Sequence, residues 1–504
     1  MDQTVVEDER RAERGVSMVL GAMVLLVLLG MAGFAVDLGW LFYQQTNTRK
    51  AAEAAALAGV VHMPQPSDVA FADGEAYATA LDVAERNGYI PNPGVVEVVP
   101  TQVPGEPYQL EVEVTDTVDT FFMRVFGIDQ LEVHDSATAE QLPALKLGSD
   151  ENHLGPGNSS ATDEDFWVAI NGDHTWKSQG DAFTAECLGH PDESCQGTNP
   201  EYGQGDNSVS PDAPSYWYAV EVPADYVGDS LQVQIFDPQT SRPGGPTDDR
   251  SLSNPNWSTT NRNSITRFRL LEPDGTPGDP TDNSVQVCSQ NYRQYQSGSY
   301  NFSWEDVWVS FCTTTAKRGT YVLEVRQSGN VNVLNAFSIR ARINGSTSNT
   351  TAVYGLGSMS LWFPNPNSTA EFKVVKLDAV YAGQQLIISL WDPGDLDDPG
   401  ALEFTTALSG IDCEVRERDD EGNTTADWHA DDGNLDSGAV GCHLDIAIQE
   451  HNNEWVDFSF DIPATYTCAD PNCWAIVDYD FPGVPHDRTT WAATVNGQPI
   501  HLVD

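Results

Sequence analysis

Four aspartates stand close together in a turn-rich segment of the C-terminal half. Asp392, Asp395, Asp397 and Asp398 belong to the sequence DPGDLDDPG, which directly follows a strand-like run. Carboxylate oxygens at the end of a strand suit Ca²⁺, which takes about six to eight oxygen ligands. The spacing differs from that of an EF-hand, and an ordinary Asx or Pro-Gly turn uses the same residue types. The segment therefore predicts either a turn or a calcium site formed by Asp392, Asp395 and Asp397.

Motifs that mark common enzyme classes do not occur in the sequence. No H-E-x-x-H, no G-x-S-x-G and no P-loop is present, so the usual signatures of metalloproteases, hydrolases and nucleotide-binding proteins are missing. We therefore expect a protein that is not an enzyme. Tryptophan faces could stack on sugars, but most of the tryptophans stand in alternating patterns that favour core packing. The residues concerned are Trp167, Trp176, Trp217, Trp304, Trp308, Trp391, Trp455 and Trp474.

All eight cysteines lie in the C-terminal part of the chain, from Cys187 onward. An even number without a C-x-x-C pair indicates disulfides in an oxidising compartment rather than a zinc site. Because a short separation in sequence makes an encounter probable, we predict four local bridges. These join Cys187 to Cys195, Cys288 to Cys312, Cys413 to Cys442 and Cys468 to Cys473.

The chain is strongly acidic, with 25 Lys+Arg against 75 Asp+Glu and a formal net charge of -50. Such a charge repels polyanions and removes the electrostatic attraction that dominates nucleic-acid binding. DNA and RNA are therefore excluded as partners. The surplus of acids favours a solubilising surface, while a halophilic host or loops that bind divalent cations remain alternatives.

One apolar segment near the N-terminus is long enough to cross a membrane. Val16 to Val36 contains Ser17 as its only polar residue, and about 20 apolar residues span the hydrocarbon core. Three arginines precede it, so the positive-inside rule predicts a cytoplasmic N-terminus. A cleavable signal peptide is the alternative, but its apolar core is shorter and ends in a small-x-small site. We expect a cytoplasmic tail over 1–15, a membrane helix over 16–36 and continuation of that helix to Gly59.

Several motifs in this region carry a family resemblance. Arg14 and Gly15 open the apolar run, GFAVDLGWLF covers the end of that run, and AAEAAALAG ends the expected helix, while FFMRVFG and LEVHDSATAEQ follow more weakly. The set resembles the N-terminal part of TadE/TadG-like Flp pilus-assembly proteins, over about residues 10–145. The resemblance implies a small α+β module over 37–145 behind the membrane helix.

One position distinguishes two branches of that family. Pseudopilins of the TadE type present a glutamate five residues after the processing glycine, and Leu20 occupies that position here. The resemblance to the TadG branch therefore implies an assembly factor that keeps its anchor. Many TadG proteins also carry a von Willebrand A-type domain, and we expect none in this chain.

The remaining chain contains an internal repeat. The segment beginning VPADYVGDSLQVQIFDP at Val222 matches LDAVYAGQQLIISLWDP at Leu377, at an offset of 155 residues. Apolar residues alternate with polar ones in short runs bounded by Gly, Pro, Asn and Asp, which is typical of β-strands joined by turns. We expect a multidomain chain whose last two domains, over 150–345 and 346–504, are all-β with sandwich or jelly-roll folds.

These observations lead to two main functional hypotheses, with an exported hydrolase of unrecognised motif as a third alternative. The first is a membrane-anchored, non-enzymatic component of Flp/Tad-type pilus assembly or of a related cell-surface apparatus, with other pilus-assembly or surface proteins as partners. The second is a surface adhesin or glycan-binding protein, in which tandem β-sandwich modules would give avidity.

Overall fold

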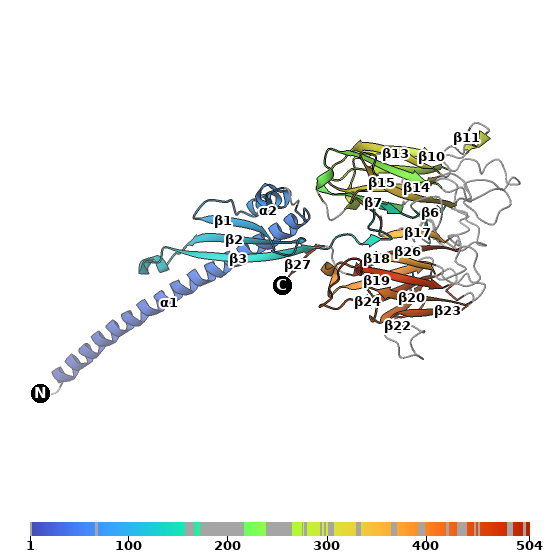
Figure 1. Ribbon diagram of the computed structural model, residues 1–504. Helices are drawn as coiled ribbons and strands as arrows, with labels where there is room; N and C mark the ends of the chain where they lie inside the picture. Colours follow the sequence, from blue (N-terminus) through green and yellow to red (C-terminus); the bar gives the residue numbers. More distant parts are fainter. Residues whose placement is uncertain are drawn as a thin grey trace. The chain divides into compact units, whose positions relative to one another are not determined.

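The computed structural model describes residues 3–65, 69–156, 166–171, 216–237, 265–274, 276, 280–292, 295–296, 299–300, 307–328, 334–363, 370–391, 399–419, 423–430, 441–447, 450–451, 454–480, 487–496 and 500–503. The chain divides into two compact units (Figure 1). The first comprises Met1–Gln141 with Pro499–Asp504, and the second comprises Leu142–Gln498.

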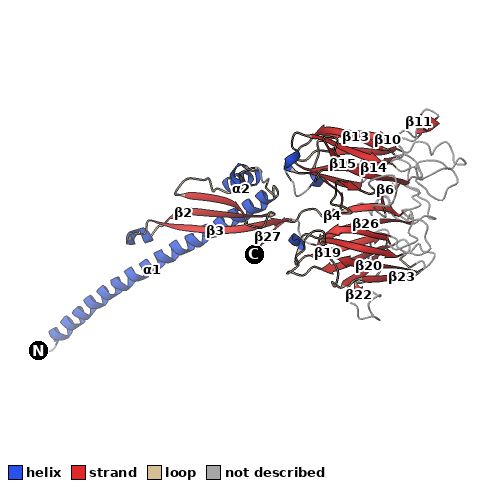
Figure 2. Cartoon of the chain, in the orientation of Figure 1, coloured by secondary structure: helices blue, strands red, loops and turns tan. Residues whose placement is uncertain are grey.

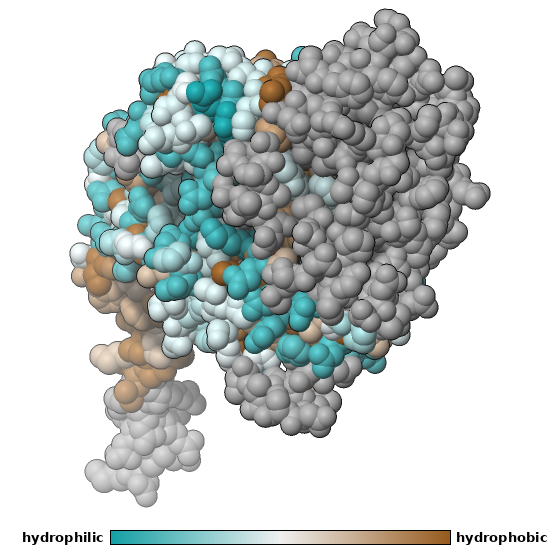
Figure 3. All heavy atoms as spheres, turned by 45° about the vertical axis from the view of Figure 1, so that its right-hand side comes forward, coloured by the Kyte–Doolittle hydropathy of each residue, from teal (hydrophilic) through white to brown (hydrophobic). Residues whose placement is uncertain are grey.

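The first unit is an α+β module built on one long helix. Helix α1 (Gln3–Val60) and helix α2 (Glu75–Arg86) accompany an antiparallel sheet in the order β1-β2-β3-β27 (Figure 2). The strands are β1 (Val96–Gln102), β2 (Gln109–Asp119), β3 (Gln130–Gln141) and β27 (Ile500–Val503). From Met18 onward, α1 is long and apolar enough to cross a membrane. Figure 3 shows hydrophobic colours gathered along this helix.

The C-terminal half of α1 packs closely against the sheet. Small side chains of the AAEAAALAG motif, among them Ala52 and Ala56, are fully buried against Leu110 and Val112 of β2. Alternation along β2 places its apolar residues on the face that meets the helix. A Cβ atom at Gly59 would lie 2.5 Å from a methyl carbon of Leu110, so glycine is required where the helix approaches the strand.

The end of the chain returns to the first unit. We expected residues 500–503 to belong to the second β-sandwich repeat, but β27 pairs with β3, with Ile500 opposite Gln141. The correction has a simple physical cause, because β3 would otherwise be an edge strand with unpaired backbone groups. A short C-terminal strand therefore completes the sheet that α1 covers.

The second unit is a sandwich of two large antiparallel sheets in the part of the chain that the structure describes. The first sheet has ten strands in the order β10-β9-β14-β7-β16-β4-β18-β25-β20-β23. Its strands are β4 (Lys146–Leu147), β7 (Tyr216–Val222), β9 (Ile265–Leu271), β10 (Gln286–Tyr292), β14 (Gly319–Ser328), β16 (Ala352–Leu356), β18 (Ala370–Lys376), β20 (Gly400–Thr406), β23 (His443–Ile446) and β25 (Trp474–Asp480).

The second sheet has eleven strands, in the order β13-β8-β15-β6-β17-β26-β19-β24-β21-β22 with β5 beside β15. Its strands are β5 (His153–Leu154), β6 (Trp167–Asn171), β8 (Ser230–Phe236), β13 (Trp308–Thr315), β15 (Leu334–Ile343), β17 (Ser358–Phe363), β19 (Gln385–Trp391), β21 (Cys413–Arg418), β22 (His429–Ala430), β24 (Trp455–Asp461) and β26 (Asp487–Asn496). A separate hairpin joins β11 (Tyr295–Gln296) to β12 (Ser299–Tyr300).

One hydrophobic core fills the space between the two sheets. Phe372 of β18 meets Trp491 of β26 with ring centroids 4.9 Å apart, and Phe404 of β20 meets Phe458 of β24 at the same distance. Edge-to-face contacts of this kind stabilise a core beyond the burial of area. The expected fold class, an N-terminal apolar helix with an α+β module followed by all-β structure, is confirmed.

The repeat found in the sequence has a counterpart in local structure. The 3-10 turn Ala224–Tyr226 and the strand β8 recur 155 residues later as the 3-10 turn Ala379–Tyr381 and the strand β19. Between turn and strand, Gly228 and Gly383 both adopt positive φ angles, +90° and +78°. Glycine takes this conformation without the penalty that a Cβ atom brings.

The strand orders of both sheets are symmetric about their centres. In the second sheet β13-β8-β15-β6 is followed by its mirror order β17-β26-β19-β24, and Trp167 lies opposite Trp362 in the central pair. In the first sheet the central strands cross over, because β16 pairs with β7 while β4 pairs with β18. The first strand of each half thus lies beside the other half. The division into 150–345 and 346–504 stays a prediction.

Three of the four predicted disulfides are confirmed. Cys288–Cys312 joins β10 to β13, and Cys413–Cys442 joins β21 to the residue before β23. Each of these bridges links the two sheets toward an outer end of the sandwich. Cys468–Cys473 closes a short loop between β24 and β25. The predicted pair Cys187 and Cys195 lies outside the described residues.

Candidate functional site

Several sites expected from the sequence fall where the structure gives no description. Asp392, Asp395 and Asp397, the candidate calcium ligands, lie outside the described residues, and the calcium site stays a prediction. The D-x-S-x-S spacing that accompanies von Willebrand A-type metal sites does occur in the sequence, at 206–210 and at 249–253. Both copies also lie outside the described residues, so the expectation that this domain type is lacking stays a prediction.

The tryptophans considered for sugar stacking are mostly core residues. Trp167, Trp391, Trp455 and Trp474 are each no more than 5% exposed. Trp308 is half-buried and lies under the guanidinium of Arg340, 4.0 Å from the ring centroid. A sugar ring needs an open aromatic face, which the four buried tryptophans do not offer. Trp176 and Trp304 lie outside the described residues.

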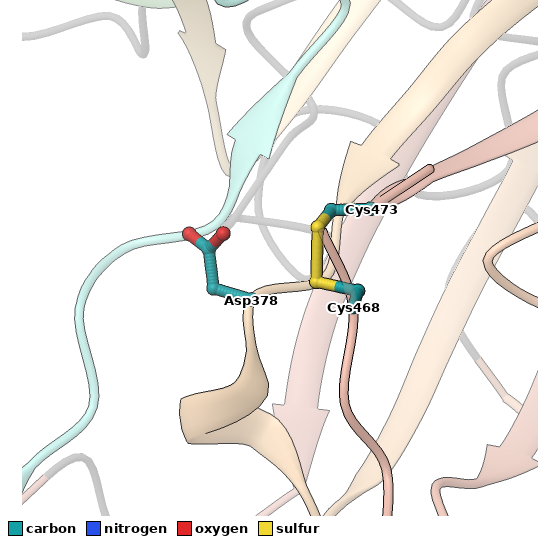
Figure 4. A group of neighbouring side chains, drawn as sticks. All are labelled: Asp378, Cys468 and Cys473. Carbon is teal, nitrogen blue, oxygen red and sulfur yellow. A yellow bond between two sulfur atoms is a disulfide. The ribbon is translucent and has the colours of Figure 1, made fainter. Parts of the chain in front are cut away.

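One group among the described residues has side-chain types that could share a metal ion. Asp378, Cys468 and Cys473 place their ligand atoms within 4.8 Å of one another. Figure 4 shows, however, that the two sulfur atoms are joined in a disulfide beside the carboxylate. Cysteine ligates metals as a thiolate, so the bridged pair is a structural link rather than a metal centre.

A buried carboxylate organises the face of β24 that points away from the shared core. Asp457 is 1% exposed and accepts hydrogen bonds from Ser389 (2.7 Å), Arg416 (2.6 Å) and Arg418 (2.6 Å). Burial alone would raise the pKa of Asp457, but the two arginines and the serine hydroxyl hold this pKa below its ordinary value. The ion pairs tie β24 to β21 and the serine hydrogen bond ties it to β19, which is a stabilising role.

A second buried carboxylate lies at the end of the apolar run of α1. Asp37 is fully buried, and its oxygens accept hydrogen bonds from the backbone N–H groups of Phe121 (2.9 Å), Phe122 (2.9 Å) and Met123 (2.6 Å). We call this arrangement the Asp37 cap. The three donors open the 3-10 turn Met123–Phe126 in the loop between β2 and β3, and unsatisfied N–H groups at such a start attract a negative charge.

Neighbouring residues on the same face of α1 complete the contact. Gly33 and Asp37 are one helical turn apart, and a Cβ atom at Gly33 would lie 2.8 Å from the ring of Phe122. Trp40 lies one turn further along and meets the ring of Phe121 edge-on, with centroids 5.7 Å apart. The motif GFAVDLGWLF of α1 thus packs against the motif FFMRVFG of the loop between β2 and β3. Both motifs were noted in the sequence, but the buried contact between them was not predicted.

The signal that could have revealed this contact is the position of Asp37 itself. A carboxylate that directly follows an uninterrupted apolar run is costly to bury unless several donors satisfy it. In the sequence, Asp37 was noted only as part of the motif GFAVDLGWLF. The cap joins residues 84 to 86 positions apart, so local patterns give no indication of the partner.

The loop between β2 and β3 continues from the cap along α1. Its tip is apolar and exposed, with Val125 at 79% and Phe126 at 75% exposure. Together with α1 it forms an open apolar hollow lined by Leu26, Val27, Gly30, Met31, Phe34 and Phe126. The loop therefore extends beside the apolar part of the helix. The residues that line the hollow include no nucleophile, acid–base pair or set of metal ligands.

Fold and site together define a class of protein with a long N-terminal helix, apolar over a membrane-spanning length, that is locked to a small α+β module and precedes a β-sandwich body. Residues 15–62 match the family model of Tad, the Flp pilus-assembly TadE/G-like proteins. The resemblance carried by the N-terminal motifs is confirmed for this segment, which includes Asp37 and AAEAAALAG. A comparison with curated proteins returned no match.

Proposed function

We propose that the chain is a membrane-anchored, non-enzymatic component of a Flp/Tad-type pilus-assembly system or of a related cell-surface apparatus. The observation that carries this proposal is the family match over residues 15–62, which coincides with an apolar helix able to cross a membrane. Within the matched segment, Asp37 and Gly33 fix the helix to the module that follows it.

In this proposal the N-terminus is cytoplasmic and the β-sandwich body lies outside the membrane. The arginines before Val16 support that orientation through the positive-inside rule. The disulfides of the second unit support it independently, since such bridges persist in oxidising compartments. The partners would be other membrane or surface proteins of the assembly apparatus, and nucleic acid is not among them.

The anchor is proposed to remain attached to the mature protein. Leu20 stands where a processed pseudopilin of the TadE type has glutamate. A carboxylate in lipid is costly unless it is paired, and leucine cannot make such a pair with the amine of a neighbouring subunit. The protein would therefore act as an assembly factor rather than as a subunit of the fibre.

The proposal is tested by deleting the gene in its own host and examining surface fibres by electron microscopy. We expect loss or shortening of the fibres, restored by the full chain but not by a variant that lacks residues 16–36. Protein purified from membranes should retain an N-terminus upstream of Val16. Normal fibres in the deletion strain would contradict the pilus-linked function, and a mature chain beginning at Val16 would contradict the retained anchor.

A further inference from the structure

The loop between β2 and β3 reaches to the level of the apolar span of α1. Phe126 lines the same hollow as Gly30 and Leu26, whereas the cap holds the loop base at Asp37. At about 1.5 Å of rise per residue, Gly30 lies roughly 10 Å and Leu26 roughly 16 Å before Asp37 along the helix. The hydrocarbon core is about 30 Å thick. When α1 crosses the membrane, the loop tip therefore lies within the depth of one lipid leaflet.

The composition of the loop suits an apolar environment. Residues 121–128 read FFMRVFGI and contain Arg124 as their only charged residue. The side chain of Arg124 points back toward the strand, since its Nε donates to the carbonyl of Thr120 (2.7 Å). Long basic side chains adopt this arrangement where their heads must stay near water while neighbouring residues are in lipid. Phe121, Phe122 and Ile128 each remain more than 40% exposed.

The loop backbone is also largely self-satisfied, which lipid requires. Asp37 accepts the N–H groups of three consecutive residues, from Phe121 to Met123. Val125 donates to the carbonyl of Phe122 (3.1 Å), and Gly127 donates to that of Arg124 (3.0 Å). Ile128 donates to the carbonyl of Met123 (3.3 Å). A water-exposed loop has no need for such extensive internal pairing, because water can satisfy its donors.

We propose that the β2–β3 loop is a second membrane contact, in which the tip at Val125 and Phe126 inserts among the lipid acyl chains beside α1. This inference rests on the membrane anchoring of α1. The occupant of the hollow is lipid, because every lining residue except Phe126 belongs to the apolar part of α1 that acyl chains surround. With two points of insertion the first unit would be held at a fixed height and rotation at the membrane surface, where a single helix would leave it free to turn.

The inference can be tested with the full chain reconstituted in vesicles of phosphatidylethanolamine and phosphatidylglycerol. The vesicles contain a phospholipid with a diazirine on its acyl chain, and cross-linked peptides are mapped by mass spectrometry after illumination. We expect lipid adducts on α1 and on residues 121–128. The double variant Val125→Asp, Phe126→Asp should lower adducts on the loop by about tenfold and leave those on α1 unchanged.

A matched control is Ile90→Asp. Ile90 is 59% exposed, and the hydroxyl of the adjacent Tyr89 lies 3.2 Å from that of Thr48 on α1. Thr48 is roughly 16 Å beyond Asp37 on the side away from the apolar run, at 1.5 Å per residue. This change should leave all lipid adducts as they are, and peptides around Ile90 should carry none.

The outcomes separate the inference from the proposed function. Adducts on α1 without adducts on the loop would overturn the inference while leaving the anchor intact. Adducts on neither segment would contradict membrane anchoring itself. In a second arm, a diazirine amino acid replaces the residue at position 125 of the full chain. Cross-links from that position to a second protein chain in place of lipid would also overturn the inference, and would assign the hollow to a neighbouring helix.

Discussion

At the scale of single residues, two buried aspartates act in different ways. Asp457 neutralises two arginines on the outward face of a sheet, whereas Asp37 accepts three backbone donors at the end of the apolar run of α1. Neither has the open surroundings that a catalytic carboxylate needs to reach a substrate. Both act by holding elements together, and their contributions can be separated because they belong to different units.

Replacing Asp457 with asparagine should destabilise the second unit at neutral pH. The change leaves Arg416 and Arg418 without their shared anion, and removing one partner of a buried ion pair costs about 3–5 kcal/mol. Because the side chains of both arginines are about one quarter exposed, we expect a smaller loss of about 2–4 kcal/mol. Near-ultraviolet circular dichroism of the full chain in detergent measures this loss of stability. The signal reports mainly on the second unit, because Trp40 is the only tryptophan outside that unit.

The stability difference between the wild type and Asp457→Asn should change with pH in a definite direction. The pKa of Asp457 is lowered in the folded protein, so its stabilising effect is complete above the pKa of an unfolded aspartate, about 3.9. The effect is lost as the pH falls through the lower pKa of the folded state. The gap in melting temperature between the wild type and Asp457→Asn should therefore shrink below about pH 4. A constant gap, or an equal loss in the exposed control Asp461→Asn, would contradict the assignment.

At the scale of elements, the sequence predicts those features that depend on residues close together in the chain. The apolar run and the alanines of AAEAAALAG predict a continuous helix, alternation predicts β8 and β19, and short separations predict the bridge Cys413–Cys442. Contacts between distant segments were not predicted. The Asp37 cap, the return of β27 to β3 and the pairing of β4 with β18 depend on packing between segments whose separate patterns do not specify a partner.

The link between α1 and the β2–β3 loop should depend on the charge of Asp37. In Asp37→Asn one carboxylate oxygen becomes an N–H donor that faces backbone donors, so at least one of the three hydrogen bonds is lost. We expect amide exchange in residues 121–128 to become about tenfold faster, as measured by mass spectrometry of the full chain in detergent. Asp119→Asn is the matched control, because Asp119 is exposed at the same end of β2 and accepts from Gln130. Equal protection in both variants would show that the cap does not fix the loop.

At the scale of the whole molecule, the strands β4 and β16 cross between the two halves of the second unit. Tyr226 of the first half contacts Thr350, just before β16, while Tyr381 of the second half donates to the carbonyl of Pro143, just before β4 (3.0 Å). Each half thus forms a hydrogen bond with the segment that precedes the strand it takes from the other half. The two halves therefore resemble two subunits of a domain-swapped dimer that exchange equivalent strands, except that here both halves belong to one chain.

This exchange predicts that the second unit folds as one body rather than as two. A fragment of residues 142–498 should unfold in a single transition, because one core runs through both halves and each sheet is continuous across them. A fragment of residues 346–498 lacks β4, β6 and β7, so the edges of β17 and β18 are unpaired and the apolar face around Phe372 is exposed. We expect this shorter fragment to aggregate when expressed alone and to be recovered as a soluble complex when co-expressed with residues 142–345. If residues 346–498 fold alone with a melting temperature equal to that of the longer fragment, the two halves are independent domains and the crossing strands contribute little to stability.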